Sequence, residues 1–71
     1  MELRKIVGEN VLQWRTENNV TQKELAEKAG IDVTYLRRIE HGKANLTANV
    51  IDLLKDTMQV PMEQLTQRKK R

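Results

Sequence analysis

The sequence predicts an all-α protein built from five short helices. Its apolar residues recur every three or four positions, and no segment alternates apolar and polar residues as a half-buried strand would. Capping residues, glycines and a single proline divide the chain into five helical segments. Its 71 residues make one small domain, and without cysteine neither a disulfide nor a thiolate metal site can stabilise it. The fold must therefore rest on helix packing and caps, either alone or together with a second subunit.

The first helix is expected over residues 3–17. Its apolar stripe consists of Leu3, Val7, Val11 and Trp14. Gly8 weakens a helix interior by roughly 1 kcal/mol relative to Ala, which is tolerable where another element packs against the backbone. Trp14 lies on the stripe, so we expect it in the core. Asn18 and Asn19 end the helix, because Asn tolerates the left-handed conformation of a C-cap.

The second and third helices have the clearest boundary signals. Thr21 and Glu24 form the pattern of a capping box, and Gly30 ends the second helix. Asp32 is a good N-cap for the third helix, which ends at His41 and Gly42. Two helices joined by about three residues that include a glycine are typical of a helix-turn-helix. The same caps and stripes fit an ordinary αα-hairpin equally well.

Two further helices complete the predicted domain. Thr47 caps the fourth, whose apolar residues are Val50, Ile51, Leu54 and Met58. Pro61 suits the first position of a short last helix that ends near Thr66, and Leu65 is expected to pack inward. We therefore predict one domain over residues 1–66, followed by a basic tail over residues 67–71.

The positive charge of the chain is concentrated in that tail. The formal net charge is +3, but four of the thirteen basic residues are Arg68, Lys69, Lys70 and Arg71. Without them nine Lys and Arg face ten Asp and Glu, a net charge of −1. A nucleic-acid-binding face on the folded part must therefore come from a local arrangement of charge. The tail is either a solvated end or an arm that follows a phosphate backbone and adds salt-sensitive affinity.

The stretch "VTQKELAEKAGIDVTYLRRIEHGK", with "NLT" and "MQVPMEQL" downstream, resembles the phage Cro/C1-type helix-turn-helix family, also called the XRE family. Gly8, Val11, Trp14 and Arg15 upstream fit the same pattern, so the resemblance covers about residues 6–65. It is closest to the small controller proteins of restriction–modification operons, although phage-type repressors and antitoxin subunits share much of it. The resemblance implies a five-helix, lambda-repressor-like DNA-binding domain. Its second helix would cross the phosphate backbone while the third enters the major groove.

The resemblance also implies roles for individual residues. Gln22 would bond a phosphate; the base-facing positions are Val33, Thr34 and Arg38; the positions that reach the backbone or base edges are Tyr35 and Arg37; the loop after the third helix would meet a phosphate through Lys43 and Asn45. Arg15 and Glu40 match a pair that ties the first helix to the end of the third, a structural role. Val33 and Ala44 depart from the pattern, since basic residues are common at both places.

Several readings of these residues stay open from sequence alone. Arg37 and Arg38 could simply form a solvated face, and Tyr35 fits DNA contact and partial burial about equally. One His, no Cys and dispersed carboxylates offer neither a tetrahedral metal set nor a nucleophile–base pair, so we expect no enzyme and no cofactor.

The function expected from these observations is transcription regulation. We expect a homodimer that binds an inverted-repeat operator in double-stranded DNA and associates through its last two helices. Leu53 and Met62 on these helices fit spare apolar groups of a dimer surface, although ordinary partial burial is the alternative. The alternative is an antitoxin-like or adaptor module whose main partner is another protein. A cytoplasmic location is expected, because the chain shows neither a signal peptide nor the roughly 20 apolar residues of a membrane span.

Overall fold

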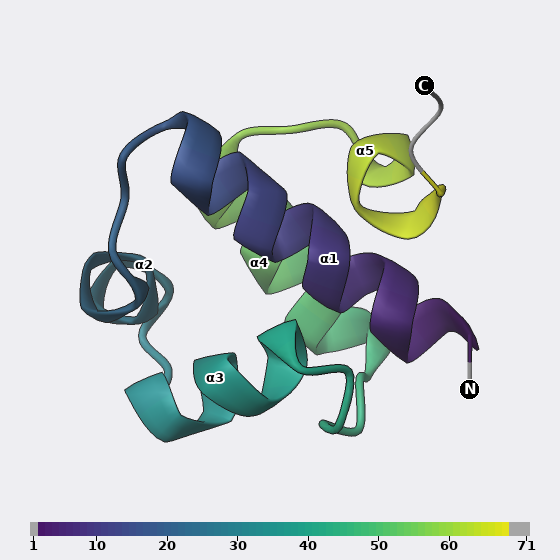
Figure 1. Cartoon of the computed structure of the whole chain (residues 1–71), viewed down its shortest axis with the longest axis horizontal. Helices are drawn as coiled ribbons and strands as arrows, with labels where there is room; N and C mark the ends of the chain where they lie inside the picture. The colour runs from purple at the N-terminus through teal and green to yellow at the C-terminus, as the bar shows by residue number, and fades with distance from the viewer. Residues whose placement is uncertain (1, 69–71) are drawn as a thin grey trace.

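The computed structural model describes residues 2–68 as a bundle of five α-helices (Figure 1). In chain order these are α1 (Glu2–Glu17), α2 (Gln22–Ala29), α3 (Val33–Glu40), α4 (Ala48–Met58) and α5 (Met62–Thr66). The prediction of an all-α fold with five helices is confirmed, and no strand occurs within residues 2–68. Lys69, Lys70 and Arg71, which carry most of the expected basic tail, lie outside the described residues.

The ends of α1 and α2 follow the local signals in the sequence. The Thr21 hydroxyl accepts from the Glu24 N–H at 3.1 Å, and the Glu24 carboxylate accepts from the Thr21 N–H at 2.8 Å. This capping box fixes the start of α2. Asn19 and Gly30 adopt left-handed conformations, with φ of 56° and 72°, and so turn the chain after α1 and α2.

The later helices begin at caps, with one shift from the prediction. Asp32 and Thr47 accept hydrogen bonds from the N–H groups of Thr34 and Val50, as expected of N-caps. Pro61 is also an N-cap and not the first residue of α5, because its ψ of 154° is extended although its φ of −69° suits a helix. The helix α5 therefore starts one residue later than predicted.

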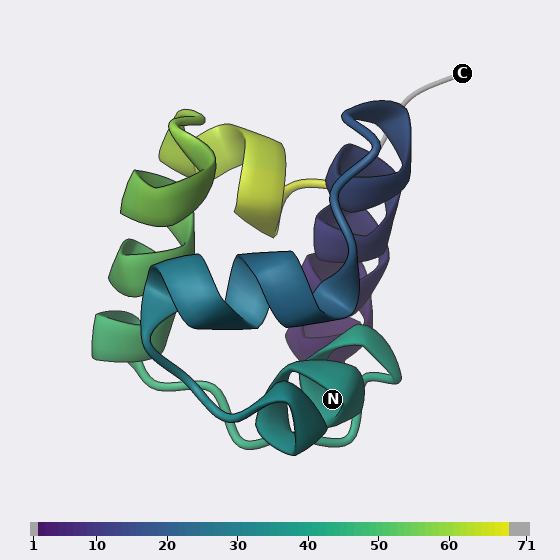
Figure 2. The same ribbon diagram turned by 90° about the vertical axis from the view of Figure 1, so that its left-hand side faces the viewer.

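The core lies where α1 packs against α3 and α5, and α2 packs against α3 and α4 (Figures 1 and 2). The largest fully buried side chains are those of Val7, Val11, Leu25, Leu36, Ile39, Leu54 and Leu65. The inward packing predicted for Leu65 is thus confirmed. Trp14 is only half-buried at the edge of the core, and Leu3 is 36% exposed because the first turn of α1 lies at the end of the molecule (Figure 1).

Two polar or small residues of α1 hold the neighbouring elements close. A Cβ added at Gly8 would collide with the carbonyl oxygen of Ile39 and lie 2.9 Å from that of Glu40, so α1 and α3 meet backbone to backbone. The buried Asn10 amide donates to the carbonyl oxygens of Leu65 at 2.7 Å and Gln67 at 2.9 Å. These contacts fix the C-terminal end of α3 on one side of α1 and the end of α5 on another.

Candidate nucleic-acid interface

The helices α2 and α3 lie side by side on one face of the molecule, and Figure 2 shows them on the side turned toward the viewer. After Gly30 ends α2, the Ile31 N–H donates back to the Ala26 carbonyl at 3.0 Å. Asp32 then caps α3 through the Thr34 N–H at 2.9 Å. The turn is held at both ends by these bonds, so the direction of α3 relative to α2 is fixed by the local sequence.

One face of α3 is buried and the opposite face is open. Leu36, Ile39 and Glu40 point into the protein. The exposed residues of the helix are Thr34, Arg37 and Arg38. A short helix with a polar, cationic outer face and an apolar inner face can present those side chains to a groove of DNA. Within the described residues, no set of three or more His, Asp or Glu side chains could hold a metal ion.

Two residues of α3 that the resemblance assigns to the DNA surface are half-buried. Val33 and Tyr35 pack against the edge of the core. The Tyr35 hydroxyl donates to the main-chain carbonyl of Asn45 at 3.0 Å, so this ring supports the loop after α3. Partial burial, one of the two alternatives for Tyr35, is therefore observed. Each of the two residues keeps part of its surface exposed.

An ion pair holds the C-terminal end of α3 against α1. The Arg15 guanidinium donates to both Glu40 carboxylate oxygens, from Nε at 2.7 Å and from Nη2 at 2.9 Å. The two side chains are only 15% and 4% exposed. The hydrogen bond to Glu40 raises the pKa of Arg15, outweighing the desolvation that lowers it, and the charge of Glu40 raises it further. Arg15 also donates to the Val20 carbonyl at 3.1 Å, so it holds the loop before α2 as well.

Gln22 connects the Arg15–Glu40 ion pair to the exposed surface of α3. Its side-chain nitrogen donates to Glu40 at 2.8 Å, and its oxygen accepts from Arg37 Nε at 3.4 Å. The predicted phosphate-binding residue of α2 and a predicted contact residue of α3 are thus brought together. Because a primary amide carries two N–H donors, one donor of Gln22 remains for another acceptor.

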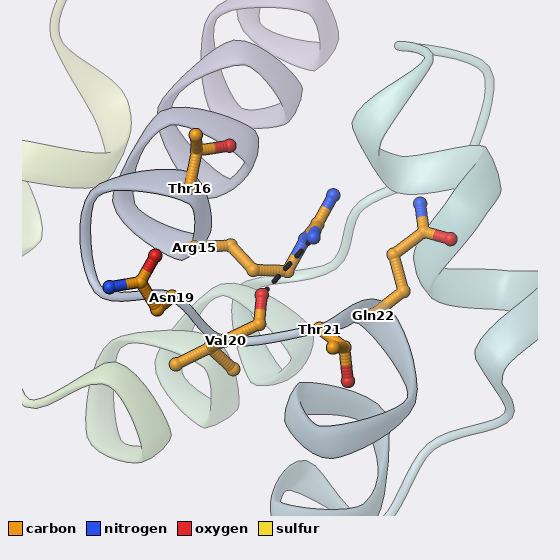
Figure 3. A pocket seen from close by; sticks show the side chains of 6 residues that line it. All are labelled: Arg15, Thr16, Asn19, Val20, Thr21 and Gln22. Atoms are coloured by element: carbon orange, nitrogen blue, oxygen red, sulfur yellow. Dashed lines mark hydrogen bonds between the residues drawn. The ribbon is translucent and has the colours of Figure 1, made fainter.

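An open recess adjoins Gln22 at the N-terminal end of α2 (Figure 3). Its lining residues are Arg15, Thr16, Asn19, Val20, Thr21 and Gln22. Figure 3 shows the Arg15 side chain reaching from α1 toward this recess, where it bonds the Val20 carbonyl. The recess is wide and exposed, so it forms part of the surface beside α2 and not an enclosed ligand site.

The loop after α3 is shaped by hydrogen bonds from α3. Arg38 Nη2 donates to the carbonyl of Lys43 at 3.1 Å, while Tyr35 holds the carbonyl of Asn45. The side chains of Lys43 and Asn45 remain exposed. The loop residue between them, Ala44, is 2% exposed and belongs to the core. The departure at Ala44 therefore has a physical reason, because a long basic side chain has no room there.

Sequence reasoning did not single out two residues that shape this region. Arg4 Nη2 donates to the side-chain oxygen of Asn45 at 2.8 Å, and the buried Asn10 ties α1 to the end of α5. Asn10 could have been found, because it lies three positions after Val7 and just before Val11 on the buried stripe. Nothing in the sequence pairs Arg4 with a residue 41 positions away.

Comparisons with known proteins match the geometry above. The sequence profile of the helix-turn-helix family matches residues 11–65. The control protein C.SmaI of Serratia marcescens is 31% identical over 68 residues, which cover 96% of this chain and 81% of that protein. The hypothetical transcription factor NHTF from Neisseria superposes with a TM-score of 0.87 at 27% identity, over 93% of this chain and 76% of that one. The wild-type restriction-modification controller protein C.Esp1396I superposes with a TM-score of 0.77 at 32% identity, over 83% and 78% of the two chains.

Proposed function

The chain belongs to the helix-turn-helix family, and we propose that it is a sequence-specific DNA-binding transcriptional regulator whose α3 enters the major groove. The observation that carries this proposal is the exposed, cationic outer face of α3, held at a fixed angle by the contacts of its buried face. One of the similar proteins is named a control protein and another a restriction-modification controller protein. We therefore place this chain among such regulators, acting in the cytoplasm of a bacterium or encoded by a phage. Within residues 2–68, no helix is long and apolar enough to cross a membrane.

Arg38 is the residue proposed to contribute most to base recognition. A guanidinium carries five N–H donors, and the bond to the Lys43 carbonyl uses one of them. The remaining donors can make a bidentate contact with the O6 and N7 atoms of guanine, worth roughly 1–3 kcal/mol of discrimination. Thr34, in the first turn of α3, would meet an adjacent base edge, and the exposed part of Val33 would pack against a thymine methyl group.

The flanking residues are proposed to position the duplex. Gln22 keeps one amide donor for a phosphate oxygen while the other is bonded to Glu40. Arg37 lies next to Gln22 and can bond the same strand, and Tyr35 supports the loop from which Lys43 and Asn45 would reach the following phosphates. Contacts of this kind set the register of the protein on the duplex and carry no sequence information themselves.

We propose that two copies bind an inverted-repeat operator with half-sites about one helical turn apart. Leu53 on α4 is 37% exposed and Met62 on α5 is half-buried, which supports a dimer surface on these helices. The Leu53→Asp substitution should lower both the dimer fraction and operator occupancy in sedimentation and binding titrations. Leu12→Asp on α1, at a residue 42% exposed, is the matched control and should change neither. An unchanged monomer–dimer equilibrium in Leu53→Asp would exclude this surface.

The proposed function is tested by titrating DNA from upstream of the protein's own gene, and a scrambled duplex of equal length, at two salt concentrations. A preference of about a thousandfold for the upstream DNA would support both specific recognition and autoregulation. In Arg38→Ala the preference should fall while binding to the scrambled duplex changes little. Equal, salt-sensitive binding of the wild type to both duplexes would refute the proposal and favour an antitoxin-like or adaptor role with a protein partner.

A further inference from the structure

The first turn of α1 lies beside the loop that follows α3. Arg4 bonds the Asn45 side chain at 2.8 Å. At Gly42, where φ is 73°, an added Cβ would lie 3.2 Å from Lys5 Cγ and 3.4 Å from Lys5 Cα. The N-terminus of α1 and this loop are also seen close together in Figure 1. Arg4 and Lys5 thus stand next to the two loop residues, Lys43 and Asn45, that are proposed to meet a phosphate.

The bond from Arg4 also determines how Asn45 is oriented. A guanidinium can only donate, so the Asn45 side chain must turn its oxygen toward Arg4 and its NH2 group away from it. The Tyr35 hydroxyl holds the main-chain carbonyl of the same residue. Asn45 therefore presents two free N–H donors outward from a fixed position, and phosphate oxygens accept such donors.

Three cationic side chains gather at this end of the molecule, those of Arg4, Lys5 and Lys43. Lys5 and Lys43 are exposed, and Arg4 is half-exposed. The ion pairs recorded within the described residues, Arg15–Glu40 and Lys55–Asp56, involve none of these three cations. The acidic residues nearest to Arg4 and Lys5 along α1 are Glu2 and Glu9, and no ion pair joins Glu9 to any of the three cations. Because the chain without its last four residues has a net charge of −1, such a group of cations is a local feature and not part of a generally basic surface.

We propose that Arg4 and Lys5 bind the phosphate backbone of the duplex held by α3, so that the DNA-binding surface continues from the loop onto the first turn of α1. Lys5 acts as a point charge on a phosphate, and Arg4 acts both directly and by orienting the amide of Asn45. This inference rests on the proposed function, because it assumes that α3 places a duplex against the loop.

The test compares the salt dependence of DNA affinity for the wild type and the Arg4→Gln, Lys5→Gln double variant on the upstream and scrambled duplexes. Each phosphate contact contributes about 0.9 to the slope of log affinity against log salt. Between about 50 and 200 mM salt the wild type should therefore lose about tenfold more affinity than the double variant. The ratio of affinities for the two duplexes should stay the same, because neither residue reads a base.

The matched control is the Lys28→Gln, Lys55→Gln double variant, which removes the same charge from the last turns of α2 and α4. It should keep the wild-type slope. The charge-preserving pair Arg4→Lys, Lys5→Arg should also keep it, and the helical circular dichroism signal checks that each variant folds. If the Arg4→Gln, Lys5→Gln double variant unfolds, the single variant Lys5→Gln should still make the salt dependence shallower, by about 0.9 in the slope of log affinity against log salt.

The role of Arg4 as a positioning residue is tested by a double-mutant cycle with Asn45→Ala. If Arg4 orients Asn45, removing Asn45 should weaken binding several-fold in the wild type and much less in Arg4→Met, which has no donor for the Asn45 oxygen. A wild-type salt slope in Arg4→Gln, Lys5→Gln, with the preference for upstream DNA intact, would overturn the inference and leave the proposed function standing. Loss of that preference in the wild type itself would refute the proposed function instead.

Discussion

The ion pair between Arg15 and Glu40 offers the sharpest test of how α3 is held in place. Arg15→Met keeps most of the side-chain volume and removes the charge, so the Glu40 carboxylate loses the donors at 2.7 and 2.9 Å. Only the Gln22 amide, at 2.8 Å, remains bonded to a carboxylate that is 4% exposed. The variant thus leaves a buried charge almost without compensation.

The expected cost follows from burial. Breaking a buried ion pair by removing one partner costs about 3–5 kcal/mol, whereas an exposed pair contributes at most about 1 kcal/mol. Arg15 keeps 15% exposure and Gln22 stays bonded, so we expect the lower end, about 3 kcal/mol. A chain of 71 residues has a free energy of unfolding of about 4–11 kcal/mol, so this loss would remove a large share of it.

Urea unfolding followed by far-ultraviolet circular dichroism measures the effect. With an m-value of about 1 kcal/mol/M, the midpoint should fall by about 3 M in Arg15→Met. The Arg15→Met, Glu40→Met double variant replaces the pair by apolar groups and should be more stable than Arg15→Met alone. A loss below about 1 kcal/mol in the single variant, or a double variant that loses the sum of both single effects, would refute the reasoning.

Three further predictions concern the elements around α3. Gly8→Ala should lower the free energy of unfolding by about 1–3 kcal/mol, because the new Cβ meets the Ile39 carbonyl; a gain of about 1 kcal/mol in urea unfolding, the helix-propensity effect, would contradict this. Ala44→Lys should lower the free energy of unfolding by about 1–3 kcal/mol or more, because it overpacks a buried position. His41→Lys, at an exposed position, should change the free energy of unfolding little. The hydrogen bond from the Thr21 N–H, followed by that from its hydroxyl, lowers the pKa of Glu24 from its ordinary 4.5. The ionised Glu24 carboxylate therefore stabilises the fold above pH 4.5, and this stabilisation is lost as the pH falls through the lowered pKa of Glu24. The melting temperatures of the wild type and of Glu24→Gln should accordingly differ near neutral pH and converge in acid.

Those parts of the fold that depend on neighbouring residues could be predicted from sequence. The capping box of Thr21 and Glu24, the left-handed Gly30 and the N-caps Asp32 and Thr47 each involve atoms within three residues of one another. Helix periodicity likewise identified the buried residues Val7, Val11, Leu54 and Met58, since the spacing of apolar residues determines which face of a helix is buried.

The parts that could not be predicted depend on contacts between distant segments. Arg4 and Asn45 are 41 positions apart, and Asn10 is 55 positions from the Leu65 carbonyl it bonds. The periodicity of α1 placed Leu3 and Trp14 with the core, but their burial depends on where the other helices stop. The family resemblance assigned Gln22, Arg37 and Arg38 to DNA without showing that each is also hydrogen-bonded within the protein.

These hydrogen bonds within the protein affect how tightly the proposed DNA-binding surface would hold DNA. Immobilising a long side chain on binding costs roughly 0.5–1.5 kcal/mol, and an interface of arginines would incur this cost several times. Here Arg37 is bonded to Gln22, Arg38 to the Lys43 carbonyl and Arg4 to Asn45 before any partner arrives. Each of these bonds uses one donor of a guanidinium that has five, so the remaining donors stay available for the proposed contacts with DNA. These bonds restrict the arginine side chains before DNA binds, so the proposed binding would cost less side-chain entropy. Preorganisation of this kind would raise the affinity for DNA without adding any contact.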